Sequence, residues 1–177
     1  MNICVFCGSS KGHNSIYSDT AKELGALFAF RQHTLIYGGG NIGLMGILAD
    51  SILSEGGRVV GIIPDFLMQK EVGHTGLTEL EIVHSMHERK KRMADLADAF
   101  IALPGGWGTL DETAEILTWR QLSLIHQPLG ILNVNGFFDP LLQQMRLMVN
   151  EGFLNSANLN SVKVSSSPEK LLSQLIP

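Results

Sequence analysis

Basic residues are scarce in this sequence. Its 13 lysines and arginines are outnumbered by 17 aspartates and glutamates among 177 residues, so the formal net charge is −4. Binding to a nucleic-acid backbone needs a clustered excess of positive charge, and this balance argues against DNA or RNA as a partner. A small anion stays compatible with the composition, because it needs only local positive potential.

Cysteine is also scarce, with only Cys4 and Cys7 in the chain. They are expected on one strand at a spacing that sends their side chains to opposite faces. This placement suits neither a zinc site nor a redox pair, so we predict two buried, inactive thiols of the kind that a reducing cytoplasm allows. His84 and His87 have helical spacing but no third ligand beside them, and we expect no metal.

Long apolar runs are absent as well. No stretch approaches the ~18 apolar residues that span a bilayer, and no basic start precedes an apolar segment. We therefore expect a cytoplasmic protein without membrane contact. The hydrophobic content of 45% is nevertheless enough to bury a core, and residues 1–177 are predicted to form a single domain.

Short apolar runs alternate with segments of helical periodicity along the chain. The predicted strands cover residues 2–7, 33–37, 58–64, 80–83, 99–103, 128–134 and, more weakly, 161–165. The predicted helices cover residues 17–30, 42–54, 86–97, 110–124, 141–151 and 168–175. Because the strands are continuously apolar, both of their faces should be covered. The order predicts an α/β fold of the Rossmann-like kind, a doubly wound parallel sheet flanked by helices.

Ligands of such sheets bind in loops at the carboxyl ends of strands. The loop after the second strand fits G-x-G-x-x-G through Gly38, Gly40 and Gly43. A dinucleotide fingerprint normally follows the first strand and is answered by an acid about 20 residues later, where this chain has Arg58. The loop therefore favours a general nucleotide or phosphate contact over nicotinamide or flavin binding, with a purely structural turn as the alternative.

The stretch LPGGWGTLDE, residues 103–112, carries the clearest signal. Its glycines let backbone amides approach an anion, and a helix beginning near Thr109 would direct its partial positive charge to the same place. A structural interpretation is equally open, because Thr109 and Glu112 have the spacing of a capping box. Glu112 and Glu115 share one helical face, and carboxylates beneath a phosphate suit an enzyme that builds positive charge on a sugar.

Arg89 is the second candidate. It lies near Met86 and Met93 on the apolar, inward face of its predicted helix, where a guanidinium needs a partner. The spacing leaves open whether that partner is a neighbouring carboxylate or a phosphate or base of a ligand.

These residues resemble the LONELY GUY family of cytokinin-activating phosphoribohydrolases, long mislabelled as lysine decarboxylases. The family pattern P-G-G-x-G-T-x-x-E is present from Pro104 to Glu112, and M-H-x-R-K followed by Met is present from Met86 to Met93. The likeness runs from Ile3 to about Phe153. At residues 120–123, where the family commonly has Ala-Gln-Leu-Gly, this chain has Arg120, Gln121, Leu122 and Ser123, in a helix expected to border the base pocket or a subunit contact.

The resemblance implies hydrolysis of the N-glycosidic bond in AMP or an N6-modified adenosine monophosphate, giving a free base and ribose 5-phosphate without a metal or other cofactor. It implies Arg89 and Glu112 as the catalytic pair, and a homodimer. The residues expected to contact the substrate are Glu71, Lys90, Gly105, Gly106, Gly108, Thr109, Asp111 and Thr118, with Gly8, Ser9, Gly39 and Gly40 from the first two loops.

Two other functions remain as alternatives. Molybdenum-cofactor carrier proteins have a similar fold and similar glycine loops, but a carrier has no use for a carboxylate under a sugar. A dinucleotide-dependent oxidoreductase is disfavoured by chain length and by the misplaced fingerprint. Lysine decarboxylation would need pyridoxal phosphate on a Schiff-base lysine, for which the sequence offers no suitable setting.

Overall fold

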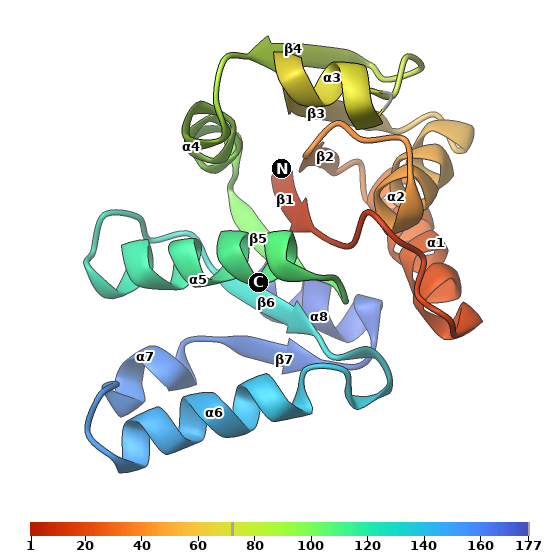
Figure 1. The fold of residues 1–177 in the computed structure, drawn as a ribbon. Coiled ribbons are helices and arrows are strands. Elements are labelled where there is room, and N and C mark those ends of the chain that lie inside the picture. Colours follow the sequence, from red (N-terminus) through yellow and green to blue (C-terminus); the bar gives the residue numbers. More distant parts are fainter. Residues whose placement is uncertain (72, 177) are drawn as a thin grey trace.

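The chain folds around one seven-stranded sheet in the order β4-β3-β2-β1-β5-β6-β7 (Figure 1). The computed structural model describes residues 1–71 and 73–176, with the side chains of residues 69–71 excepted. The strands are β1 (Asn2–Phe6), β2 (Thr34–Tyr37), β3 (Arg58–Pro64), β4 (Glu79–Val83), β5 (Ala99–Ala102), β6 (Leu129–Leu132) and β7 (Lys163–Ser165). Every neighbouring pair is parallel, as the sequence predicts.

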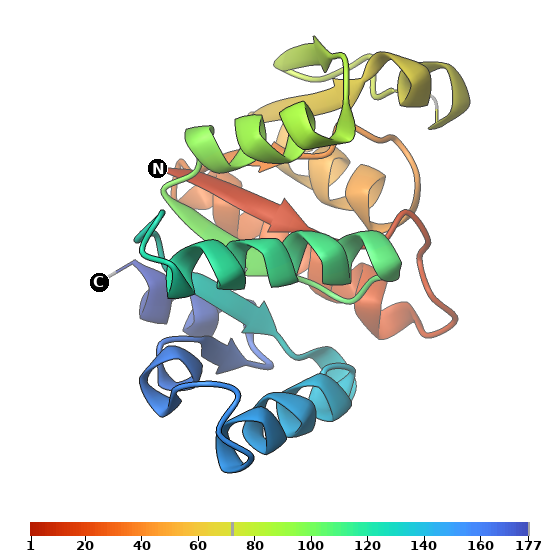
Figure 2. The same cartoon turned by 60° about the vertical axis from the view of Figure 1, so that its left-hand side comes forward.

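Helices cover both faces of this sheet (Figure 2). The helices are α1 (Ser15–Phe30), α2 (Gly43–Ser54), α3 (Asp65–Glu71), α4 (Met86–Leu96), α5 (Trp107–Gln121), α6 (Asp139–Asn150), α7 (Ser156–Asn160) and α8 (Pro168–Leu175), with a 3₁₀ turn at Val134–Gly136. One buried cluster joins α1, α2 and α8 to the sheet, and a second joins α4, α5 and α6 to the opposite face. This arrangement is the predicted doubly wound α/β architecture.

The two faces explain the continuously apolar strands. Cys4 on β1 packs in the α4–α5–α6 cluster, and Cys7, directly after β1, packs in the α1–α2–α8 cluster, so side chains of this segment serve both cores. Both thiols are free and buried, and burial raises the pKa of the Cys7 thiol far above its usual value. A thiol held in its neutral form is a poor nucleophile, which agrees with the prediction of inactive cysteines.

Two helices begin after a serine that caps their first amides. The Ser85 hydroxyl accepts from the Glu88 amide at 3.1 Å, and Ser167 caps α8 by accepting from the Lys170 amide at 3.4 Å. The sequence prediction missed α3 and α7. These helices have seven and five residues, which is too short for helical periodicity to be recognised. Within residues 1–71 and 73–176, no helix has the length and apolar composition needed to cross a bilayer.

The strand order places the switch of chain direction at β1. The chain runs outward from β1 through β2 and β3 to β4, and then returns to β5 on the other side of β1. The chain therefore continues from β1 and from β5 to opposite faces of the sheet, and a crevice is expected at the carboxyl ends of these two strands. Directly after the strands the two loops are still in contact, since the Gly8 amide donates to the Pro104 carbonyl at 3.1 Å.

Candidate active site

The glycine-rich turn after β5 leads directly into α5. Gly106 is the N-cap and has no side chain to satisfy the first helical amides, while Thr109 already lies inside the first turn and is 3% exposed. The capping-box interpretation of Thr109 and Glu112 is therefore wrong, because α5 begins at Trp107, earlier than the helical periodicity indicated. The first amides of α5 point to the crevice without a side-chain cap.

Two glycines of this turn have open space beside them. A Cβ added at Gly106 or Gly108 would meet no other described atom within 4 Å. Gly106 is the N-cap, where glycine is acceptable, but Gly108 lies inside α5, where glycine is destabilising by about 1 kcal/mol relative to alanine. At Gly105, by contrast, an added Cβ would overlap Thr109 and lie 2.8 Å from the Gly8 nitrogen. The space over Gly106 and Gly108 thus suits an external group that approaches the backbone closely.

A hollow of about 230 Å³ adjoins the same turn. Its walls come from the loop after β1, including Ser9 and Lys11, and from Gly105 and Gly106. Tyr17 and Phe137 supply aromatic edges on the side of α1. An anion in this hollow would meet unsatisfied amides and the positive end of a helix.

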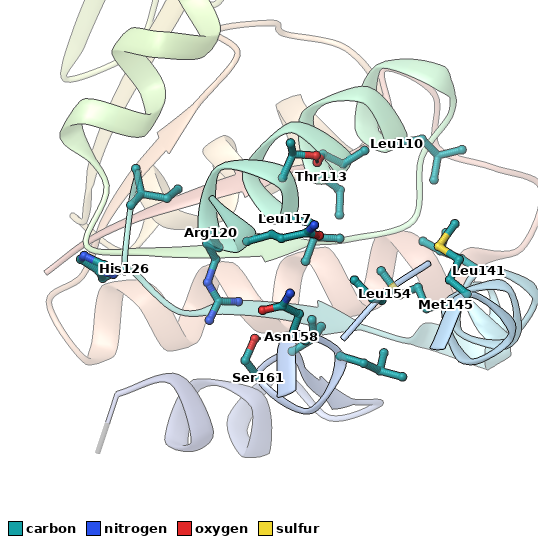
Figure 3. Close-up of a pocket in the computed structure, with 17 residues that line it drawn as sticks. Leu110, Thr113, Leu117, Arg120, His126, Leu141, Met145, Leu154, Asn158 and Ser161 are labelled. Atoms are coloured by element: carbon teal, nitrogen blue, oxygen red, sulfur yellow. Dashed lines mark hydrogen bonds between the residues drawn. The ribbon is translucent and has the colours of Figure 1, made fainter. Parts of the chain in front are cut away.

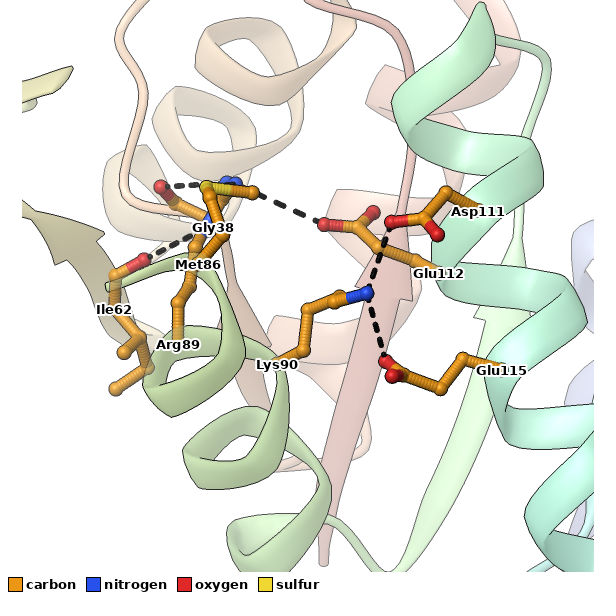
Figure 4. Close-up of polar contacts among 8 residues, drawn as sticks. All are labelled: Gly38, Ile62, Met86, Arg89, Lys90, Asp111, Glu112 and Glu115. Carbon is orange, nitrogen blue, oxygen red and sulfur yellow. Dashed lines mark hydrogen bonds and ion pairs between the residues drawn. The ribbon is translucent and has the colours of Figure 1, made fainter.

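Arg89 projects from α4 into the crevice and is 7% exposed. Its Nε donates to the Ile62 carbonyl at 3.2 Å and its Nη2 donates to the Gly38 carbonyl at 3.1 Å, as Figure 4 shows. The remaining nitrogen, Nη1, lies 3.8 Å from Glu112 Oε1 and 3.8 Å from Met86 Sδ. Two backbone carbonyls therefore aim the guanidinium at Glu112.

Glu112 faces Arg89 from α5, and its side chain is 11% exposed (Figure 4). Burial raises the pKa of Glu112 from 4.5 to about 7, with Asp111 and Glu115 adding to the rise and with Arg89 and Lys90 opposing it. A carboxylate with a pKa near neutrality can exchange protons at physiological pH, which is the property that a general base or acid needs.

Lys90, which follows Arg89 on α4, pairs with two other carboxylates of α5. Its Nζ lies 3.0 Å from Asp111 Oδ2 and 3.2 Å from Glu115 Oε2. Although burial by itself lowers the pKa of Lys90, the hydrogen bonds that its ammonium donates to these two carboxylates raise the pKa above its usual value. The ammonium is shared between two partners, and Glu112 keeps Arg89 as its nearest cation.

The pKa of Glu112 predicts a pH-dependent gain in stability for Glu112→Gln. Because the folded-state pKa lies above the unfolded value, the stabilising contribution of Glu112 is present below pH 4.5 and is lost as the pH rises through 7. Glutamine does not ionise. When the pH is raised from 5 to 8, the difference in free energy of unfolding between Glu112→Gln and wild type should therefore shift in favour of the variant by up to about 3 kcal/mol. Denaturant titrations at both pH values measure this, and an equal difference at the two values would contradict it.

The other expected binding residues divide into two groups. Gly39 and Gly40 lie in the loop after β2 beside Gly38, and the loop after β1 that carries Gly8 and Ser9 lies beside the turn at Gly105. Thr118 lies elsewhere, on the far side of α5 from Glu112, where its hydroxyl donates to the Ala114 carbonyl at 2.7 Å. The side chain of Glu71 lies outside the described residues, so its role stays a prediction.

Sequence reasoning did not find three parts of this site. The carbonyls of Gly38 and Ile62 orient Arg89, but backbone carbonyls leave no signature in a sequence. Lys11 lines the hollow beside the glycine turn, and its position directly after the loop residues Ser9 and Ser10 was the available signal.

Among the described residues, no cluster of three or more His, Cys, Asp and Glu side chains could hold a metal.

Comparison with known proteins identifies the family. The family described as "Possible lysine decarboxylase" matches residues 45–175. The chain is 43% identical to cytokinin riboside 5′-monophosphate phosphoribohydrolase LOG1 of Arabidopsis thaliana over 173 residues, covering 98% of this chain and 81% of that protein. The chain belongs to the LONELY GUY (LOG) family. It is also 50% identical to LOG of Oryza sativa subsp. japonica over 152 residues, covering 86% of this chain and 63% of that protein.

Solved structures show how widely the fold of this LOG family member is shared. The molybdenum cofactor binding protein of Rippkaea orientalis superposes with a TM-score of 0.73 at 25% identity, covering 99% of this chain and 97% of that chain. The molybdenum cofactor carrier protein of Chlamydomonas reinhardtii superposes with a TM-score of 0.71 at 19% identity, with the same coverage. The second likeness is one of fold alone, so the function has to be argued from the site.

Proposed function

We propose that this protein hydrolyses the N-glycosidic bond of a cytokinin riboside 5′-monophosphate or AMP, releasing the free base and ribose 5-phosphate. The observation that carries the proposal is the buried pair of Arg89 and Glu112 beside an uncapped, glycine-lined helix N-terminus. The relatives with 43% and 50% identity are named for this activity.

The 5′-phosphate is assigned to the turn at Gly105–Thr109. The open space over Gly106 and Gly108 admits phosphate oxygens to the first amides of α5, and Lys11 adds positive charge in the adjoining hollow. A phosphate fixed there would hold the ribose, and binding energy from this remote group would then serve the bond-breaking step.

Glu112 and Arg89 are assigned to the chemistry. As the bond from C1′ to the base nitrogen breaks, positive charge builds on the ribose, and the Glu112 carboxylate stabilises it. Glu112 also takes a proton from the attacking water, whose oxygen bonds to C1′. The electrons of the broken bond stay on the base nitrogen, which takes the proton back from Glu112. Arg89 keeps its Nη1 directed at this space because its other nitrogens are bonded to backbone carbonyls.

Product release from two substrates tests the proposal. The purified chain is incubated with AMP and with isopentenyladenosine monophosphate, and the free base and ribose 5-phosphate are measured by chromatography. Stoichiometric appearance of both products supports hydrolysis. Tight binding of either nucleotide without release would instead favour the carrier function suggested by the Rippkaea orientalis relative.

The site argues against lysine decarboxylation. A lysine that forms a Schiff base is activated by a lowered pKa, whereas Asp111 and Glu115 raise the pKa of Lys90. A carrier has no need for a carboxylate with a pKa near 7 opposite an arginine. Both arguments favour the glycosidic hydrolase, which is the function that uses the buried pair of Arg89 and Glu112.

We also propose that the protein is a homodimer through the outer face of α5 and α6. A groove of about 550 Å³ lies there, bounded by α5, α6 and α7 (Figure 3). Its walls are largely apolar, and Met148 at its rim is 38% exposed. Leu122 and Phe153, which follow α5 and α6, are 60% and 85% exposed. A patch with both a groove and projecting apolar side chains is suited to a two-fold contact with its own copy.

Arg120 supports this surface. Its Nη1 is buried in the groove and has no hydrogen-bond partner among the described residues, and burial lowers the pKa of its guanidinium. A buried guanidinium nitrogen requires an acceptor, and a second chain would supply one if the Arg120 side chain turned outward on association. Thr118 lines the same groove, so in the dimer it would reach substrate only from the neighbouring copy.

Disrupting this face is expected to halve the particle mass. Met148→Glu would place a charge at the groove, and light scattering should report 19.3 kDa where wild type gives twice that value. Phe30→Glu, at an 86% exposed apolar residue on the opposite layer, is the matched control and should stay dimeric. A monomeric wild type, or a dimeric Met148→Glu variant, would refute the assignment.

A further inference from the structure

His74 is a buried polar side chain outside the crevice of Arg89 and Glu112. It lies between α3 and β4 and is 7% exposed. Its Nδ1 accepts from the Gly76 amide at 3.1 Å, and its Nε2 lies 2.9 Å from Asp50 Oδ1 on α2. Because Nδ1 is the acceptor, Nε2 carries the proton and donates to Asp50. The imidazole therefore connects the segment after α3 to α2. Helix α2 directly follows the glycine-rich loop after β2, residues 38–42 (the glycine loop).

The backbone of that segment grips the loop after β2. The His74 amide donates to the Gly39 carbonyl at 3.0 Å, and Gly73 forms an antiparallel bridge with Gly40. From the core side, the Tyr37 hydroxyl donates to the Gly40 carbonyl at 3.2 Å. The loop is thus held between β2 and the segment that His74 anchors.

The same loop aims Arg89. The Gly38 carbonyl accepts from Arg89 Nη2, and a Cβ added at Gly38 would lie 2.9 Å from Arg89 Cζ, so the loop and the guanidinium are in direct contact. Any movement of the loop would move the carbonyl that orients Arg89 toward Glu112.

We propose that His74 is a positioning residue for the reaction. Its bond to Asp50 keeps residues 73–76 against the glycine loop, and the loop in turn keeps the Gly38 carbonyl under Arg89. This proposal rests on the proposed hydrolase function. Asp50 is 67% exposed, so its bond to His74 contributes little to global stability and acts mainly on geometry.

Steady-state kinetics with AMP tests the proposal. His74→Ala is expected to lower kcat about tenfold and to leave KM within about twofold, since Arg89 acts on the breaking bond while the phosphate is held on α5. His74→Gln, whose amide nitrogen can still donate to Asp50, should recover most of the lost kcat.

Thr78→Ala is the matched control. Thr78 belongs to the same segment, but its hydroxyl accepts from the Val59 amide at 3.0 Å and anchors the segment to β3, away from the glycine loop. This variant should lower Tm and leave kcat unchanged. An unchanged kcat in His74→Ala, an equal loss in Thr78→Ala, or no recovery in His74→Gln would overturn the positioning role.

A second measurement separates this proposal from the function on which it rests. Phenylglyoxal modifies arginine side chains, and the Arg89 peptide can be followed by mass spectrometry without any turnover. Arg89 should react at least about threefold faster in His74→Ala than in wild type or Thr78→Ala, because its guanidinium loses the Gly38 carbonyl. If wild type hydrolyses no nucleotide but this difference appears, the hydrolase function fails and the positioning role stands; equal rates refute the positioning role.

Discussion

Glu112→Gln is expected to lower kcat for AMP hydrolysis by about 10³-fold while the affinity for AMP changes little. Glutamine keeps the shape of the side chain but can neither carry the negative charge that stabilises the ribose cation nor accept a proton from water. The proposed phosphate contacts lie on the turn at Gly105–Thr109 and do not involve the Glu112 carboxylate. Stopped-time assays of adenine release, with AMP binding measured by calorimetry, separate the two effects.

Glu115→Gln is the matched control for this result. Glu115 lies one turn further along α5, and its carboxylate contacts Lys90 at 3.2 Å, which keeps Asp111 as a second partner. The same chemical change should therefore cost no more than about tenfold in kcat. Full activity of Glu112→Gln would assign Glu112 to structure and remove the basis of the proposed mechanism.

Gly38→Ala should have the second largest effect, a loss of about 10²-fold in kcat with the fold retained. The new methyl group would overlap the Arg89 guanidinium, lying 2.9 Å from Cζ, and the flexible end of the arginine would have to move away from Glu112. The variant thus tests the position of Arg89 without altering that residue. Kinetics with AMP and thermal unfolding followed by circular dichroism give the two readouts.

A glycine without such a contact controls for loss of stability alone. At Gly56 an added Cβ would meet no atom within 4 Å, but φ is +74°, so Gly56→Ala should destabilise the fold by about 1 kcal/mol through backbone strain. Its kcat should equal that of wild type. If Gly38→Ala loses no more activity than Gly56→Ala, Arg89 is not held where the Gly38 carbonyl places it.

Much of the fold could be predicted from hydrophobic patterns. Seven predicted runs became seven strands. The five central strands are apolar along nearly their whole length because helices cover both of their faces, whereas the edge strands β4 and β7 are more exposed and carry charged residues. The antiparallel bridge between Gly40 and Gly73 had no such signal, since a contact between two loops leaves no periodicity. The start of α5 was placed too late for a related reason: glycines at 105, 106 and 108 hide a helical turn that periodicity alone cannot detect.

The candidate site was only partly predictable. Spacing placed Glu112 and Glu115 on one face of a helix, and both carboxylates face the crevice, where Arg89 and Lys90 meet them. Spacing could not choose between a carboxylate and a ligand as the partner of Arg89, and backbone carbonyls in fact accept from two of its three nitrogens. The position of Thr118 on the outer side of α5 also depends on which helix face the sheet covers.

The sequence by itself determined the fold class, the family and the residue types of the site, because these are written in periodicities and in motifs within single segments. Only the tertiary structure decided that Arg89 and Glu112 face each other, that Glu112 has a pKa near 7, and that His74 connects to the glycine loop. Each of these depends on distances between segments far apart in the chain and on how much water the packing excludes, and a pattern along one segment contains neither quantity.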